Sequence, residues 1–229
     1  HVVHDIPVTA AAHGGVEQSA AANGVTRAAR GAARHVSALE GAAAAMSRMA
    51  YKFLARGALG PISEVAWPAP RDGAPGEWVQ ANAPLAVCES GVHVCGPEEL
   101  AHWLHEELWL VEVDGSELPG IDCRVATRAR LVREIDAWRT GGAARFAEAA
   151  RDHAAQLVAA ALPEAQPLLL QFVADASKHL PRGSTALAAF CSAMAVAWMH
   201  GRDHFDGEAY RTERAWQSAF IASDLRLQG

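Results

Sequence analysis

The sequence predicts an α+β protein with a small mixed β-sheet in its middle. Two observations predict this class. Residues 25–50 and 142–229 have a helical pattern, but in the middle of the chain the apolar residues fall in short alternating runs. Prolines and glycines bound those middle runs, as they bound strands. The expected segments are residues 1–50, an Ala-rich extension and helix, 51–139, an α+β domain, and 140–229, a helical bundle.

Composition is that of a globular protein, with 229 residues, 51% hydrophobic residues and 20% charged residues. The net charge of −6 disfavours a general nucleic-acid-binding role. The sequence contains no run of 18 or more apolar residues, so it predicts no membrane span. The start of the chain lacks the features of an export signal, and four cysteines without framework spacing favour a reducing cytosol. We therefore expect a cytoplasmic protein with no membrane association.

The first segment is rich in alanine. Residues 1–24 have little periodicity and are expected to be loosely ordered, whereas residues 25–50 predict a helix without proline. Arg27, Arg30 and Arg34 recur on one face of that helix. This stripe either binds an acidic partner or is a solvated face.

The middle segment predicts strands at 51–54, 78–80, 85–88, 92–95 and 108–113. Pro97 opens a short helix that extends to Leu104, and Asp114-Gly115 is expected to end the strand at 108–113. The segment 123–138 is ambiguous, because its first half alternates like a strand and its second half has helical spacing.

The last segment predicts helices at about 142–162, 167–180, 184–200 and 208–226, with prolines at the breaks. Asp206-Gly207-Glu208 predicts the acidic first turn of the last helix. The loop at 200–208 is rich in possible cation ligands but lacks the alternation of a calcium loop.

The run from Cys88 to Cys95 is the most informative stretch, with two thiols, an imidazole and a Ser90-Gly91 turn. Alternation after that turn places His93 and Cys95 on one face of the next strand. The turn would set Cys88 opposite about His93, which disfavours a disulfide between Cys88 and Cys95.

Three chemistries remain open for this run. Cys88, His93 and Cys95 could bind zinc together with His102 or His105, although the spacing matches no established zinc motif and we predict no metal. Alternatively, His93 could activate the Cys88 thiol as a nucleophile. The third interpretation is structural, with buried cysteines and a histidine bonded to a loop carbonyl.

The Cys-x-Ser-Gly-Val-His-x-Cys pattern resembles the signature of an uncharacterised domain family of bacterial and phage proteins. The resemblance covers about residues 50–138 and includes the aromatic strand at Tyr51 to Phe53 and the Pro-opened helix. It differs in Val92, where phenylalanine is usual, and in an insertion from Trp67 to Gly76. This family implies no activity.

The order of an aromatic strand, a Gly-Val-His strand, a helix and an acidic strand is also similar to ADP-ribosyltransferase-like domains. That resemblance implies a nucleotide ligand and roles for Tyr51, Ser90 and Glu112, with Lys52 where arginine or histidine is usual. With His93 from the central run, these residues form the candidate catalytic set. The likeness rests on fold-level analogy.

The candidate ligand-binding residues are the two central cysteines and three arginines on one strand face: Cys88, Cys95, Arg124, Arg128 and Arg130. His102 and His105 lie three residues apart, next to Glu106 and Glu107. They either bind metal or belong to a solvated helix face.

We expect an interaction or immunity-type protein or a ligand-binding module, with a nucleotide-using transferase as the alternative. The stretch Glu213-Arg214-Ala215-Trp216-Gln217 is similar to the last helix of some bacterial immunity-type helical domains. The expected partners are a protein or a nucleotide. The sequence predicts neither a cofactor nor an oligomeric state.

Overall fold

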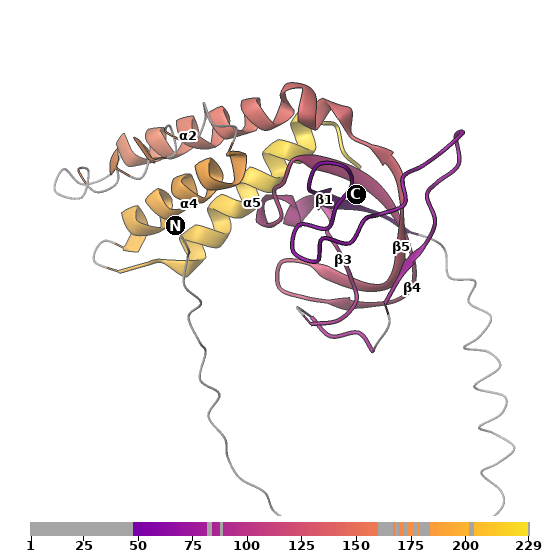
Figure 1. Cartoon of the computed structure of the whole chain (residues 1–229). Helices are drawn as coiled ribbons and strands as arrows, with labels where there is room; N and C mark the ends of the chain where they lie inside the picture. Colours follow the sequence, from indigo (N-terminus) through magenta and orange to yellow (C-terminus); the bar gives the residue numbers. More distant parts are fainter. Residues whose placement is uncertain are drawn as a thin grey trace, which may run out of the picture. The chain divides into compact units, whose positions relative to one another are not determined.

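The structure is a computed structural model, and it describes residues 48–81, 84–87, 89–159, 184–201 and 204–228, with isolated positions between 167 and 178. These residues belong to one compact unit, Ala45–Gly229. An antiparallel sheet and several helices make up this unit (Figure 1), which confirms the α+β class. Most of the predicted helix at 25–50, including its arginine stripe, lies outside the described residues.

The first strand begins earlier than predicted. β1 spans Arg48–Leu54 and pairs with β4, Glu107–Pro119, over its whole length. Residues 48–50 were expected to end a helix, and that prediction is wrong. Ala50 lies opposite Val111, and both side chains are buried, so sheet pairing outweighs the helix propensity of alanine there.

The sheet curls round on itself. β5, Arg124–Glu134, pairs with β4, with β2 at Val79–Gln80 and with β3 at Val92–Val94. Beyond β3, the backbones of Tyr51 and Cys95 exchange two hydrogen bonds of 2.8 and 2.9 Å. β3 is thus linked to both β5 and β1. Each of these pairings is antiparallel, so the expectation of mixed strand directions is wrong.

β4 and β5 are longer than predicted. β4 continues past Asp114-Gly115 to Pro119 through a register shift, and Gly115 there has a φ of 86°. β5 continues to Glu134. The helical spacing in the second half of 123–138 comes from three buried residues: Leu131 lies within β5, whereas Ile135 and Trp138 follow its end. Among the described residues of the predicted strand at 85–88, Ala86 forms a bridge with Ser90.

The helices follow the prediction closely. The short helix is a 3₁₀ segment, η1, at Pro97–His102. A π-helical turn, η2, at Trp138–Gly142 leads into α2 at Ala143–Ala159, and α4 and α5 span Thr185–Gly201 and Gly207–Asp224. The predicted helix at 167–180 lies mostly outside the described residues. Within the described helices, none has the length and hydropathy needed to cross a bilayer.

Asp206 confirms the predicted start of the last helix. Its side chain accepts hydrogen bonds from the backbone N–H groups of Glu208 and Ala209 at 2.9 and 3.1 Å. This is the N-cap arrangement that an acidic residue makes at the first turn of a helix.

Two apolar clusters lie on opposite faces of the curled sheet. One contains Ala50, Leu54 and Val111 and is covered by Trp67 from the loop after β1. The other joins the sheet to the helices, where the Phe53 and Trp138 rings meet edge to face at 5.1 Å between centroids.

A buried polar network attaches α5 to η1 and α4. Arg214 donates to the Ala101 carbonyl in η1 and, at 2.9 Å, to the Gln217 side chain. Gln217 in turn donates to the Ala189 carbonyl in α4 at 3.0 Å, and Ser218 accepts from the Ala101 N–H at 3.0 Å. Since η1 leads directly into β4, this network also positions the segment at 102–105.

Candidate ligand-binding cavity

A cavity of about 700 Å³ lies along the line where β1 and β3 meet. Its wall is formed by both strands, the loop at 60–67, the segment at 79–81, Glu89 and Gly91 before β3, and the segment at 102–105. Most of the lining side chains are apolar or aromatic, and Lys52 is the one lysine or arginine among them. Volume and composition are those of a pocket for a small organic molecule.

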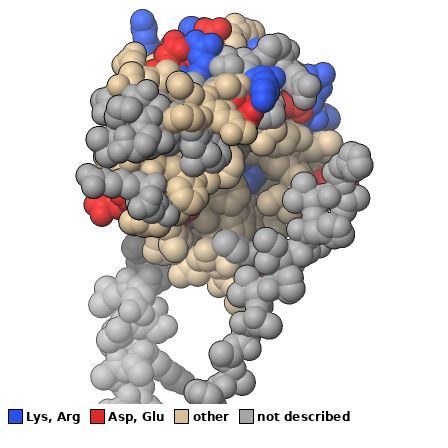
Figure 2. Space-filling model, turned by 90° about the vertical axis from the view of Figure 1, so that its left-hand side faces the viewer, with Lys and Arg blue, Asp and Glu red and all other residues tan. Residues whose placement is uncertain are grey.

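Figure 2 shows one face of the described part of the molecule, on which charged side chains gather at the top. The middle of that face is hollowed, its surroundings are mostly uncharged, and a basic side chain lies inside the hollow.

Lys52 extends from β1 into a largely apolar environment. Its Nζ donates a 2.6 Å hydrogen bond to the His93 carbonyl and lies 5.0 Å from the centre of the Trp67 ring. Burial of the ammonium lowers the pKa of Lys52 from 10.5 to about 8, although the nearby Cys95 and Cys123 thiols oppose that shift. A cation so placed is costly to fold, which is typical of a residue with a function.

His93 lines the same cavity from β3. Its pKa is lowered, first by burial and then by the charge of Lys52, while a hydrogen bond with the Gly91 backbone opposes the shift. The imidazole is therefore neutral at pH 7. Its ring lies 6.1 Å from the Trp103 ring, between centroids. His93 thus bonds to the backbone and also lines the cavity.

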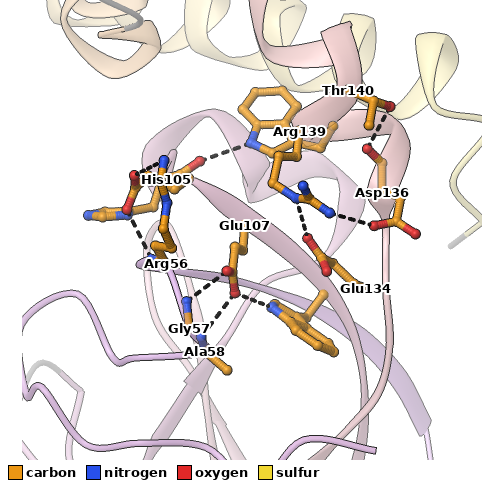
Figure 3. A network of polar contacts seen from close by, with 12 residues as sticks. Arg56, Gly57, Ala58, His105, Glu107, Glu134, Asp136, Arg139 and Thr140 are labelled. Carbon is orange, nitrogen blue, oxygen red and sulfur yellow. Dashed lines mark hydrogen bonds and ion pairs between the residues drawn. The ribbon is translucent and has the colours of Figure 1, made fainter.

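The loop after β1 forms one wall, and the buried carboxylate of Glu107 holds this loop in place (Figure 3). Glu107 accepts hydrogen bonds from the backbone N–H groups of Gly57 and Ala58 at 2.8 and 3.0 Å, and from Trp109 Nε1 at 3.1 Å. Ala58 then accepts from the N–H of Trp67 at 2.9 Å. The carboxylate thus determines where Trp67 covers the sheet.

Trp103 also lines the cavity, directly after η1. Its Nε1 donates to the Asp122 carbonyl at 2.6 Å, so the polar edge of the ring is bonded and its position is set. Leu104, next in the chain, is buried in the cluster that joins sheet and helices.

The four candidate catalytic residues do not surround one pocket. Tyr51 and His93 line the cavity, but Ser90 and Glu112 do not belong to its wall. The Tyr51 hydroxyl donates to the Gln228 carbonyl at 2.8 Å and accepts from the Gln228 N–H at 3.0 Å, so the end of the chain occupies it. Glu112 accepts from Arg130 Nε at 2.7 Å.

The central turn falls earlier than predicted. Ala86 and Ser90 exchange backbone hydrogen bonds of 2.9 Å, so the chain has already reversed before Ser90-Gly91. Gly91 instead passes close to β5, where an added Cβ would lie 2.1 Å from Val125 Cγ1. This close approach is the physical role of the glycine in the run.

Cys88 lies outside the described residues. Cys95 is a free thiol that donates to the Tyr51 carbonyl at 3.3 Å, and burial raises its pKa to about 12. A thiol held protonated in this way is a poor nucleophile and a poor metal ligand. The absence of a Cys88–Cys95 disulfide stays a prediction.

The three candidate arginines lie on β5, away from the cavity wall, and each is paired with carboxylates. Arg124 contacts Glu98 and Glu99, whereas Arg128 and Arg130 pair with Asp114 and Glu112 on β4. Both of the latter also stack on Trp78, at 4.7 and 4.4 Å from its ring centre. The charges of the three arginines are therefore balanced by carboxylates of the protein itself, which disfavours a role in binding an anionic ligand.

His102, His105 and Glu107 are not on one helix, which corrects the predicted helical spacing. His102 ends η1, His105 follows in the connection, and Glu107 begins β4. Within the described part of the chain, no group of three or more His, Cys, Asp or Glu side chains is arranged to hold a metal ion.

A second cavity of about 480 Å³ lies between the helices. His153 stacks on Trp216 there, 3.8 Å between ring centres, and its Nδ1 lies 2.9 Å from a Glu213 carboxylate oxygen. Burial raises the pKa of Glu213 to about 7, although the hydrogen bond from Gln217 and the charge of Arg214 both act to lower it.

Sequence reasoning missed Lys52, Trp67 and Trp103 as site residues. Lys52 carried a usable signal, because it is one of only two lysines in an arginine-rich chain and lies between Tyr51 and Phe53 on a predicted strand. The two tryptophans had no local signal, since it is the sheet closure that brings them to one cavity.

A comparison of the chain with known proteins finds no matching family model, no matching curated protein and no matching solved structure.

Proposed function

We propose that the chain is a ligand-binding module whose main cavity holds one small, largely apolar organic molecule. The observation that carries this proposal is the cavity of about 700 Å³ at the contact of β1 and β3, with its mostly apolar and aromatic wall. Pockets of this size and composition bind molecules of drug-like size.

The two walls that would hold the ligand are anchored independently. Glu107 secures the loop that carries Trp67, and the Arg214 network secures the η1 segment that leads to Trp103. A pocket whose walls are already bonded loses little conformational entropy when it binds. The arrangement therefore supports a preformed site.

Part of the rim of the cavity is apolar as well. Ile62 and Val65 belong to its lining, yet their side chains are 87% and 51% exposed. Exposed apolar groups around a pocket commonly mark a binding site. They would be covered in part when a ligand is bound.

The transferase alternative has less support. It needs Tyr51, Ser90, His93 and Glu112 around one opening, and the cavity wall includes only Tyr51 and His93. The Tyr51 hydroxyl and the Glu112 carboxylate are already engaged by Gln228 and Arg130.

The test is a fluorescence titration with N-phenyl-1-naphthylamine, an uncharged apolar probe that brightens in apolar surroundings. We expect saturable 1:1 binding to the intact protein. Ala81 lines the cavity, so Ala81→Phe should fill part of it and weaken binding at least tenfold. Ala144→Phe, at an exposed position on α2, is the matched control and should bind like the wild type.

Circular dichroism checks that both variants are folded. Non-saturable fluorescence, or equal affinity in Ala81→Phe and Ala144→Phe, would contradict the proposal. Replacing His93 by glutamine adds a second readout, because a purely structural histidine changes stability and leaves probe affinity unaltered.

A further inference from the structure

We propose that Lys52 captures the ligand through a carbonyl group, by forming an imine between its Nζ and an aldehyde or ketone carbon in the cavity. This inference rests on the proposed ligand-binding function and names the chemical class of the ligand. It requires that Lys52 Nζ has a defined position, that it can lose its proton near pH 7, and that a ligand in the cavity can reach it.

The amine has a defined position. Its hydrogen bond to the His93 carbonyl and its place above the Trp67 ring fix Nζ at the wall of the cavity. No carboxylate of the described residues forms an ion pair with it. An ammonium with a carboxylate partner would be held charged, and Lys52 has no such partner in the described part of the chain.

Burial favours the neutral amine, which is the form that attacks a carbonyl. With a pKa of about 8, roughly a tenth of Lys52 is neutral at pH 7. An unperturbed lysine is neutral in less than about one part in a thousand at that pH. The surroundings thus raise the reactive fraction by about two orders of magnitude.

The chemistry balances without a redox partner. The neutral Nζ of Lys52 forms a bond to the carbonyl carbon while the π electrons move to oxygen, and a proton then moves from nitrogen to that oxygen to give a carbinolamine. A proton from solvent converts the carbinolamine hydroxyl to water, which leaves, and a protonated imine remains. The products are one iminium ion and one water, with no oxidant or reductant.

The chain supplies its own control, because Lys178 is the only other lysine. Lys178 forms an ion pair with Asp175, and 69% of its side chain is exposed. It therefore reports the reactivity of an ordinary surface amine, and the amino terminus can be followed separately in the same peptide map.

The experiment treats the whole protein at pH 7 with 2-naphthaldehyde and sodium cyanoborohydride, which reduces an imine to a stable secondary amine. Peptide mass spectrometry then counts adducts at each site. We expect labelling at Lys52 to exceed that at Lys178 at least tenfold, with a rate that rises to half its maximum near pH 8. N-phenyl-1-naphthylamine should suppress the label at Lys52 alone.

The variants are Lys52→Met, which should lose the fast adduct, and Lys178→Arg, which should keep it. The wild-type map decides the question even if Lys52→Met does not fold. Equal labelling of the two lysines, or labelling that the naphthylamine probe does not suppress, would overturn the inference. If that probe binds but Lys52 is not labelled, the carbonyl inference fails and the ligand-binding function stands. If the probe does not bind, the proposed function itself fails.

Discussion

Glu107 offers a sharp test of how the cavity wall is held. Its carboxylate accepts three hydrogen bonds, two from the backbone at Gly57 and Ala58 and one from Trp109 (Figure 3). Glu107→Ala leaves all three donors without an acceptor in a buried place. Glu107→Gln keeps the shape of the side chain and one acceptor oxygen, but its amide NH₂ group then faces an N–H donor that the second carboxylate oxygen had accepted from.

The magnitudes follow from the number of donors left unpaired. Each buried donor without a partner costs about 1–3 kcal/mol. One oxygen of Glu107 serves Ala58 and Trp109 together, so glutamine can keep those two and lose only Gly57. We expect a loss of about 1–3 kcal/mol for Glu107→Gln and about 3–5 kcal/mol for Glu107→Ala.

Urea unfolding followed by circular dichroism measures both values. Glu148→Gln, at an exposed position on α2, is the matched control and should stay within about 0.5 kcal/mol of the wild type. Glu107→Ala should also weaken binding of the naphthylamine probe, because the loop that carries Trp67 loses its anchor. A loss below about 1 kcal/mol for Glu107→Ala would refute this account of the wall.

Three further predictions concern single residues. Lys52→Met should stabilise the protein at pH 7 by about 1–2 kcal/mol. In the wild type, a Lys52 pKa lowered to about 8 corresponds to a folding cost of roughly 3 kcal/mol, which the variant no longer has. The variant also loses the hydrogen bond to the His93 carbonyl, which offsets about 1 kcal/mol of this gain. The folded pKa lies below the unfolded one, so wild-type stability should rise between pH 8 and 10.5 and that of Lys52→Met should not; urea unfolding across this range decides. Gly91→Ala should cost about 2–4 kcal/mol in thermal or urea unfolding, since its φ is 128° and the new Cβ meets Val125; an unchanged midpoint would contradict the geometry. Glu213 has a folded pKa of about 7 against 4.5 unfolded, so its contribution to stability should be fully present below pH 4.5 and be lost as the pH rises from 4.5 through 7; in Glu213→Gln this loss between pH 4.5 and 7 should be absent, and its persistence would show that another group is responsible.

The sequence predicted the strands and helices well where local patterns decide. Alternation located β1, β3 and the core of β4, and proline placed η1. Errors arose where distant pairing decides instead. β4 and β5 support each other beyond Asp114, so a turn-like Asp-Gly pair became part of a long bulged strand.

The candidate site was predicted only in part. His93 and Cys95 were singled out by their shared motif, and the structure places both at the cavity. Lys52 meets them only because the Tyr51–Cys95 hydrogen bonds link β1 to β3. Contacts across 40 or more residues leave no periodic trace in a sequence, which explains why the cavity could not be predicted.

A crystal structure of the protein grown with N-phenyl-1-naphthylamine tests the central claim most directly. The account predicts one probe molecule in the main cavity, between the Trp67 and Trp103 walls and beside Lys52. Probe density only in the second cavity at His153 and Trp216, or only on the outer surface, would contradict it.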